Sequence, residues 1–370
     1  MSNESLNINL MRSMLLNQHH EGCVMTSIND VSWLDLLCQT SYDTYHLPGY
    51  LQACTENEGG DIKVVIIRHD GMTLGVPLLI RSLPFGEKGF DACSPYGYPC
   101  AIASKGSEGD WDVLWKMFCQ YLRGINVLSI FLRFNPLLTS GECLNAAKMI
   151  GNVVSEGETV YVDLQQNEEF LWLQTREPFR RAIKKLINSG WKFVADDWTF
   201  LQSFIEMYNS TMQRNGASNF YFFPDNYFTS LRDLLGKNIS LHSVLDPDGN
   251  HVSAGLYLSN GKIVQYHLGG THSDYLNMAP SKLLYHGSCR WYKNKGAHTL
   301  HFGGGLGGKQ DGLFTFKAGF SKNRAMYHTC RIILDKHQYE RLTAKNLGMS
   351  KGTITTSSSY FPLYRAASIT

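Results

Sequence analysis

Three consecutive strand-like segments constrain the fold of this chain most. They read ISLHSVLD (239–246), HVSAGLYLS (251–259) and KIVQYHLGG (262–270), and the two short links between them are PDGN and NG. Asp-Gly and Asn-Gly favour the tight turns that join antiparallel strands. The pattern therefore predicts a three-stranded antiparallel meander.

A helix and one more strand follow the meander. The amphipathic stretch 281–295 ends at Gly296, and HTLHFGG (298–304) is expected to form the strand. Strands, a helix and another strand in this order predict a mixed sheet with helices packed on it, which is an α+β arrangement. The unit 251–304 resembles the N-acetyltransferase-like (GNAT) fold, in which the N-terminus of this helix faces the phosphates of an acyl donor.

The first half of the chain contains similar elements. IKVVIIRHDG (62–71) and LGVPLLIRSLP (74–84) are β-branched runs joined at an Asp-Gly turn, so they predict a hairpin. A second cycle begins near residue 158, with the strand-like ETVYVDL and a helix that carries REPFRRAIKKLINSG. A chain of 370 residues exceeds one ordinary domain. We therefore expect a flexible tail at 1–26, two domains at 27–155 and 156–340, and a second tail at 341–370.

Composition and charge exclude several classes of protein. The net charge of +2 creates no overall field for a polyanion, so a nucleic-acid site would have to be local. The apolar runs are strand-sized and far too short to span a membrane, and the N-terminus lacks a secretory signal, so we expect a cytoplasmic protein. The nine cysteines include no C-x-x-C pair and the histidines lack metal-ligand spacing, so no metal site is expected.

The loop before the 281–295 helix departs from the pattern of enzymes that use acyl-CoA. GNAT enzymes of that class carry a glycine-rich R/Q-x-x-G-x-G/A turn there, which lets backbone amides approach the pyrophosphate. The corresponding loop here reads THSDYLNMAPSKLL, without a glycine and without Arg or Gln in register. We therefore expect an acyl donor other than coenzyme A.

Several passages together resemble the FemABX-type transferases. They include YHLPGYLQA, DACSPYGYP, FRRAIKKLINSGW, YHLGGTHSDYLNMAPSKLLYHGSCRWYKNKGAHTLHFGGG and DGLFTFKAGF, and they span residues 42–330. The resemblance implies two tandem GNAT-like domains. It also implies transfer of an aminoacyl group from aminoacyl-tRNA to an amine on a cell-envelope precursor or a small metabolite, with no bound cofactor. Many relatives are known only as GNAT-like acyltransferases, so acyl-CoA remains the alternative donor.

The FTFKAGF motif holds the strongest catalytic candidate. Phe-Lys at this point is the most specific motif of the family, so the resemblance implies that Lys317 is catalytic and that Phe316 is its packing neighbour. A cation among aromatic rings would meet the tRNA 3′-terminal phosphate or the ester oxyanion. The alternative is an exposed lysine, and in both cases we expect a strand here.

Two further groups lie near this motif in the sequence. Gly303, Gly304 and Gly305 form either a phosphate-binding nest or a bulge where backbones approach closely. Tyr266 and His267 end the third meander strand, which borders the acyl site in GNAT-like domains. His267 is either a general base for the attacking ammonium or a hydrogen-bonded core histidine.

Two substrate surfaces complete the set of candidates. Arg180, Arg181, Lys184 and Lys185 form two positive ridges on one helix, which are either a solvated face or a track for the tRNA phosphate backbone. Tyr96 and Tyr98 in the loop SPYGYP are either part of a rigid turn or a wall of the acceptor site.

The function expected from the sequence is amide formation by direct attack of an amine on an activated acyl carbon. Aminoacyl-tRNA is the expected donor. The alternatives are an acyl-CoA-dependent N-acyltransferase and a non-catalytic GNAT-like module that binds tRNA or a carrier.

Overall fold

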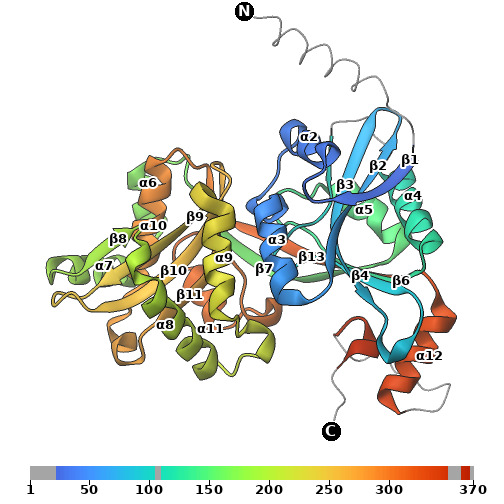
Figure 1. Cartoon of the computed structure of the whole chain (residues 1–370). Helices are drawn as coiled ribbons and strands as arrows, with labels where there is room; N and C mark the ends of the chain where they lie inside the picture. The colour runs from blue at the N-terminus through green and yellow to red at the C-terminus, as the bar shows by residue number, and fades with distance from the viewer. Residues whose placement is uncertain (1–21, 105–109, 349–359, 367–370) are drawn as a thin grey trace, which may run out of the picture.

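The structure is a computed structural model that describes residues 22–104, 110–348 and 360–366 (Figure 1). The described strands are β1 (Gly22–Ser27), β2 (Asp61–His69), β3 (Met72–Ser82), β4 (Phe90–Cys93), β5 (Ile102–Ala103), β6 (Val127–Arg133), β7 (Asn152–Asp163), β8 (Lys192–Ala195), β9 (Ile239–Leu245), β10 (His251–Ser259), β11 (Ile263–Thr271), β12 (Thr299–Gly303) and β13 (Arg324–Ile333). The described α-helices are α2 (Val31–Gln39), α3 (Pro48–Glu58), α4 (Asp110–Gly124), α5 (Gly141–Ile150), α6 (Glu168–Gln174), α7 (Glu177–Asn188), α8 (Leu201–Arg214), α9 (Asp225–Leu235), α10 (Ser281–Asn294), α11 (Gly312–Lys317) and α12 (Lys336–Leu347).

One mixed sheet runs through both halves of the molecule. Its strand order is β1-β2-β3-β4-β6-β13-β7-β12-β11-β10-β9-β8, with β5 paired to β3. The α+β class predicted from the sequence is confirmed. The part of the sheet formed by the first half of the chain meets the part formed by the second half at β13 and β7. These two strands lie side by side near the centre of the molecule (Figure 1).

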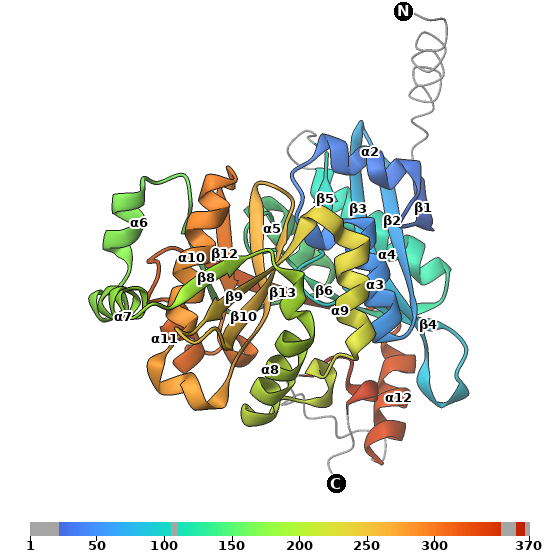
Figure 2. The same cartoon turned by 60° about the vertical axis from the view of Figure 1, so that its left-hand side comes forward.

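The predicted meander is confirmed as β9, β10 and β11, and β12 is added parallel to β11. The glycines of both turns have positive φ, +88° at Gly249 and +95° at Gly261, which a side chain would disfavour. The pairing of β10 with β11 shifts by one residue at Leu256 and Tyr257, so His267 forms a bulge. Helices α7 and α10 cover one face of this part of the sheet, and α8 and α9 cover the other (Figure 2).

Two long strands join the halves. β13 pairs with β6 along Thr329–Ile333 and with β7 along Arg324–Arg331, and β7 then pairs with β12. The expected domain boundary between residues 155 and 156 falls inside β7. Strand β13 extends the sheet of the first half although it lies near the end of the second half in sequence. The division into domains at this point stays a prediction.

The predicted tails are wrong at their inner ends. Strand β1 pairs antiparallel with β2 and includes residues 22–26. Helix α12 continues to Leu347, and the short helix Leu363–Arg365 packs under it with Tyr364 buried. Apolar contacts and hydrogen bonds to the first half order both segments. The remaining tail positions, 1–21, 349–359 and 367–370, lie outside the described residues.

The strand expected at FTFKAGF is also wrong, because residues 312–317 form the helix α11. The Asp311 side chain accepts a hydrogen bond from the backbone N–H of Phe314 and thereby caps the helix N-terminus. The cap and one turn of helix place the Phe316 ring against Phe179 of α7 and Tyr285 of α10.

Candidate active site

Lys317 lies in the interior between the two halves of the chain. Its side chain is 7% exposed, and its ammonium donates a hydrogen bond to the carbonyl of Gly304 at 2.7 Å. Gly303, at φ +77°, lies beside it: a Cβ at this position would be 3.6 Å from Lys317 Nζ and 3.8 Å from the hydroxyl of Tyr98. The structure therefore brings together Lys317, Gly303 and Tyr98, which were predicted separately. The Lys317 ammonium and the Tyr98 hydroxyl both face the space beside the Gly303 α-carbon.

The Lys317 ammonium is poorly compensated. Burial lowers its pKa from 10.5 to about 8, although Asp311 acts in the opposite direction. No carboxylate oxygen among the described residues lies within ion-pair distance of it. A buried cation with a single carbonyl partner retains N–H donors for an oxyanion.

The glycine-rich segment is a close approach of backbones. A Cβ on Gly305 would lie 2.1 Å from the carbonyl oxygen of Lys309, and one on Gly308 would lie 2.0 Å from that of Glu156. The backbone N–H of Leu306 donates to Asp311, and the N–H of Gly308 donates to the carbonyl of Gly305. These contacts explain the glycines structurally, and a role of Gly303, Gly304 and Gly305 in substrate binding stays a prediction.

His267 and Tyr266 belong to opposite faces of β11. His267 is buried among tyrosines, with Nε2 3.2 Å from the hydroxyl of Tyr227 and Nδ1 3.5 Å from that of Tyr45. Burial lowers its pKa to about 3, which makes it a weak base. Tyr266 packs instead against Tyr285, on the side of α10. The two residues predicted to act together therefore face different spaces, and their roles stay predictions.

The predicted acceptor tyrosines lie where the halves meet. The ring of Tyr98 contacts the rings of His301 and Tyr327 at centroid distances of 5.5 and 5.1 Å. Tyr96 packs against His267 and Phe220. Both tyrosines are half-buried and both touch residues of the second half.

The structure adds a buried polar chain that sequence reasoning missed. Asp43 Oδ2 accepts hydrogen bonds from Gln265 Nε2 and, at 3.0 Å, from Asn135 Nδ2. Gln265 Oε1 lies 2.7 Å from His301 Nδ1. These four residues are buried, and the chain joins the first half of the sequence to β11 and β12. The only signal in the sequence was a polar residue within each of the apolar strands KIVQYHL and HTLHFGG.

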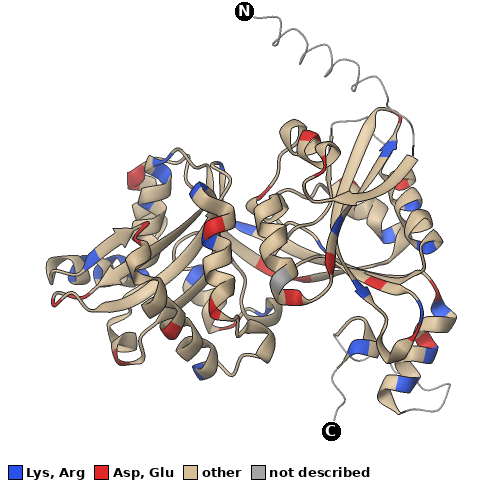
Figure 3. Cartoon of the chain, in the orientation of Figure 1, with Lys and Arg blue, Asp and Glu red and all other residues tan. Residues whose placement is uncertain are grey.

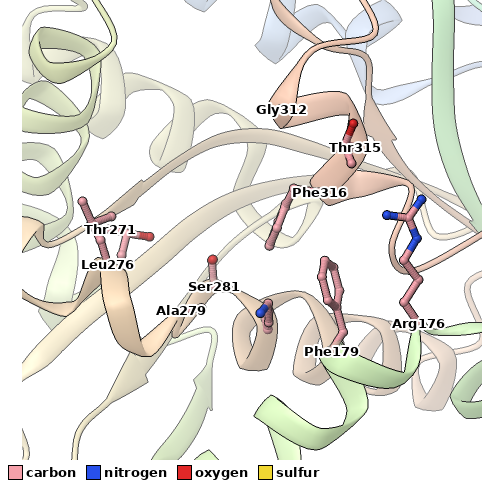
Figure 4. Close-up of a pocket in the computed structure, with 10 residues that line it drawn as sticks. Arg176, Phe179, Thr271, Leu276, Ala279, Ser281, Gly312, Thr315 and Phe316 are labelled. Carbon is pink, nitrogen blue, oxygen red and sulfur yellow. The ribbon is translucent and has the colours of Figure 1, made fainter.

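A cavity of about 450 Å³ opens at the start of α10 (Figure 4). Phe179 of α7 and Phe316 of α11 approach it from neighbouring elements, and Arg176 and Lys282 supply positive charge. The Lys282 ammonium lies 4.6 Å from the centre of the Phe179 ring. Phe316 thus lines the cavity, whereas the next residue, Lys317, reaches Gly304 and the interior between the halves.

The backbone at the start of α10 offers few free donors. The N–H groups of Lys282 and Leu283 donate to the carbonyls of Ala279 and Pro280 at 3.0 and 2.9 Å. Pro280 has no N–H, and the N–H of Ala279 donates to Leu276. An ordinary helix leaves its first N–H groups free for a ligand, so this helix start is a poor cradle for a pyrophosphate.

The basic residues of α7, coloured blue in Figure 3, are mostly exposed. Arg181, Lys184 and Lys185 are exposed, and Arg181 lies 3.6 Å from Glu177 on the same helix. Arg180 differs, because its guanidinium donates to the carbonyls of Leu173 and Thr175. The four cations therefore do not act as one set: Arg180 holds the α6–α7 connection, while the other three are exposed, with Lys184 lying 5.6 Å from the centre of the Trp172 ring.

Comparison with known proteins assigns the second half of the chain. Residues 174–317 match the family model of the acetyltransferase (GNAT) domain. This part of the chain is similar to a GNAT domain. The matched segment contains α7, the meander, α10 and β12, and it ends at Lys317. No curated protein matches the sequence.

Solved structures are similar in fold to both halves of the chain. The crystal structure of FemX has a TM-score of 0.61 and 14% sequence identity, and the match covers 80% of this chain and 93% of that chain. A conserved protein of unknown function from Bacteroides thetaiotaomicron has a TM-score of 0.56 and 7% identity, with 85% of this chain and 100% of that chain covered. The FemABX-like GNAT fold predicted from the sequence is confirmed.

Two kinds of feature are absent from the described residues. None of the helices among them combines the length and the apolar character that a membrane span requires. No three His, Cys, Asp or Glu side chains in these parts of the chain are grouped to hold a metal ion.

Proposed function

We propose that this GNAT-type acyltransferase forms an amide by moving an aminoacyl group from aminoacyl-tRNA to an amine. The observation that carries the proposal is the cavity at the start of α10, which is aromatic and cationic but offers few of the free amides that a pyrophosphate site uses. Lys317 directly follows Phe316, which lines this cavity. The proposal places the protein in the cytoplasm, where charged tRNA is made, and requires no bound cofactor.

The cavity suits the 3′-terminal nucleoside of a tRNA. The rings of Phe179 and Phe316 offer stacking surfaces for a base, and Arg176 and Lys282 offer charge for one phosphate. Coenzyme A would bring a pyrophosphate to a helix start where Lys282 and Leu283 already use their N–H groups. The exposed cations of α7 supply further positive charge for phosphates next to this cavity.

The reaction itself needs no covalent enzyme intermediate. The acceptor nitrogen attacks the ester carbon of the donor, and negative charge develops on the carbonyl oxygen. Lys317 Nζ and the Tyr98 hydroxyl face the same small space and would stabilise that charge. The C–O bond to the ribose then breaks, and the acceptor is released as the amide product. We expect this acceptor to be a small metabolite or a cell-envelope precursor.

One alternative activity has support of its own. GNAT domains include acetyltransferases by name, so an acyl-CoA donor remains the second candidate. A non-catalytic binding module would leave the buried, poorly compensated Lys317 ammonium without a use, because an unpaired buried cation is costly.

The donor is tested by an assay of purified protein with total aminoacyl-tRNA, with and without ribonuclease, beside a panel of acyl-CoAs. We expect ribonuclease-sensitive transfer to an added amine and no saturable coenzyme A binding at sub-millimolar concentration by calorimetry. Tight binding of acetyl-CoA, together with transfer from it, would replace the tRNA proposal with the acyl-CoA alternative.

A further inference from the structure

A second cavity, of about 280 Å³, lies among α6, α7 and α10. The buried apolar side chains of Val162 and Phe320 line it, together with Trp172 of α6 and His286 of α10. Trp172 and His286 are only half-buried, so part of each ring is open to a ligand. The reaction proposed above gives none of these four residues a role.

The second cavity neighbours the cavity at the start of α10, which we call the first cavity. Lys282 lines the first cavity and His286 lines the second, and the two share one face of α10 because they are four positions apart. Four residues of helix span about 6 Å along its axis. Phe179 of the first cavity contacts Phe320 of the second, with ring centroids 5.2 Å apart. A ligand with two planar groups on a short link can therefore place one group in each cavity.

Trp172 combines an aromatic surface with a nearby positive charge. Lys184 Nζ of α7 lies 5.6 Å from the centre of the Trp172 ring, and the His286 ring lies edge-on to it at a centroid distance of 5.2 Å. No carboxylate oxygen in the described part of the chain lies within ion-pair distance of Lys184. Glu168, the acidic residue of this cavity, pairs instead with Arg290 at 3.3 Å. Aromatic rings beside cations that no carboxylate neutralises are typical of sites for single-stranded nucleic acid, where bases stack and phosphates meet positive charge.

His286 offers the second cavity both a hydrogen-bond donor and an acceptor. Burial lowers its pKa to about 4, the positive charge of Arg290 acts in the same direction, and Glu168 opposes both, so the ring is neutral near pH 7. Its side chain makes no hydrogen bond to another described residue. A neutral imidazole has one N–H donor and one acceptor nitrogen. This combination suits the edge of a base better than a phosphate, which only accepts hydrogen bonds.

We propose that the second cavity binds the base of the nucleotide next to the 3′-terminal nucleotide of the donor tRNA. This inference rests on the proposed function, which places the terminal nucleoside in the first cavity. The Trp172 ring stacks on the base, His286 hydrogen-bonds to the edge of the base, and Lys184 meets an adjoining phosphate. Arg181 and Lys185 continue the positive charge along the exposed side of α7, which favours a polynucleotide over a single coenzyme.

Two RNA probes test this inference by fluorescence anisotropy with the full chain. One is a short labelled single-stranded RNA that ends in CCA, as tRNA does, and the other is the same RNA with an abasic residue at the penultimate position. We expect the wild type to bind the abasic probe roughly tenfold more weakly, because one stacked base is lost. This comparison needs no variant, so it does not depend on the folding of a substituted chain.

Trp172→Leu then tests whether that base lies in the second cavity. The variant should bind the complete probe roughly tenfold more weakly than the wild type and should differ by less than about twofold between the probes, because both changes remove the same contact. A tryptophan that only supports the fold would weaken both probes and leave their difference intact. Trp111→Leu on α4, where Trp111 is half-buried against Trp115, is the matched control and should keep the wild-type difference.

Equal binding of the two probes by the wild type, or the full wild-type difference in Trp172→Leu, would overturn the inference. If the wild type nevertheless transfers an aminoacyl group from tRNA, the proposed function stands and only the role of the second cavity is rejected. A wild type that binds neither probe and transfers only from acyl-CoA would reject the proposed function and this inference with it.

Discussion

At the scale of single residues, the burial of Lys317 has the largest consequences. The motif pointed to this lysine, but only the structure shows that it is 7% exposed and bonded to Gly304. A lysine on an exposed strand would have an ordinary pKa and little effect on turnover. The buried ammonium has a lowered pKa and remaining donors, which is the condition for strong stabilisation of an oxyanion.

The first prediction concerns turnover. Lys317→Ala should reduce kcat by roughly two to three orders of magnitude, as expected for the loss of one oxyanion donor. Lys317→Arg should retain only part of the wild-type kcat, because a planar guanidinium does not reproduce the geometry of a point charge. Since the charged form is lost as pH rises through about 8, wild-type kcat should fall there, whereas the arginine variant should not. Steady-state kinetics between pH 6 and 10 measure both effects, and near wild-type turnover in Lys317→Ala would move the site elsewhere.

The second prediction concerns the stability of the fold, and the lowered pKa of Lys317 determines how stability depends on pH. The folded-state pKa lies below the ordinary lysine value of 10.5, so the unfolded chain binds more protons between about pH 8 and 10.5. The charged lysine therefore costs stability below pH 8, by about 3 kcal/mol if the whole shift is realised. Lys317→Met should be more stable than the wild type at pH 7, and this advantage should shrink as pH rises to 10. Urea unfolding at several pH values measures it, and a less stable variant at pH 7 would contradict it.

At the scale of elements, α7 combines an inner apolar face with an outer basic face. Ile183 and Leu186 are buried, while Arg181 and Lys185 point outward with ordinary exposure. Periodicity in the sequence sufficed for this division, because a helix turns once every 3.6 residues. The structure adds that Arg180 is engaged with backbone carbonyls, so it is not equivalent to its neighbours.

Charge reversal on α7 should separate a tRNA track from a solvated face. Arg181→Glu with Lys185→Glu should weaken tRNA binding and lower the salt slope by about one for each phosphate that is no longer neutralised. The fold should survive, since exposed charges contribute little to stability. Filter binding over a range of salt concentrations gives the slope, and Lys336→Glu on α12, whose side chain is 81% exposed, is the control. If the double variant has the same salt slope as the wild type, the cations of α7 form an ordinary solvated face and not a tRNA track.

At the scale of the whole molecule, the end of the chain completes the first half. β13 extends its sheet, and Tyr364 is 1% exposed with its hydroxyl 2.7 Å from Ser129 and 3.2 Å from Asp91. Arg365 forms an ion pair with the same aspartate. The two halves are consequently interlocked through segments that lie far apart in sequence.

We expect Tyr364→Ala to cost about 3–5 kcal/mol, the usual penalty for truncating a buried aromatic ring. The loss arises from the cavity beside Tyr339 and Leu128 and from the two hydrogen bonds. Urea unfolding measures it, with the exposed Lys336→Ala as a control that should stay within about 0.5 kcal/mol. An unchanged midpoint would show that this segment does not support the fold.

Local patterns in the sequence were enough to predict the meander, the first hairpin, the helices α7 and α10, and the fold class. Turn residues and hydrophobic periodicity act over a few positions, so they can be read directly. They failed at FTFKAGF, where the side chain of Asp311 caps a helix in place of the expected strand. The surroundings of the candidate site could not be read in this way. Gln265 and Asp43 are bonded across 222 positions, and Tyr98 reaches the space above Gly303 from the other half of the chain. The sequence thus determined the elements and named Lys317, but only tertiary packing decided its burial, its lowered pKa and its neighbours, because these depend on contacts between segments that no local pattern encodes.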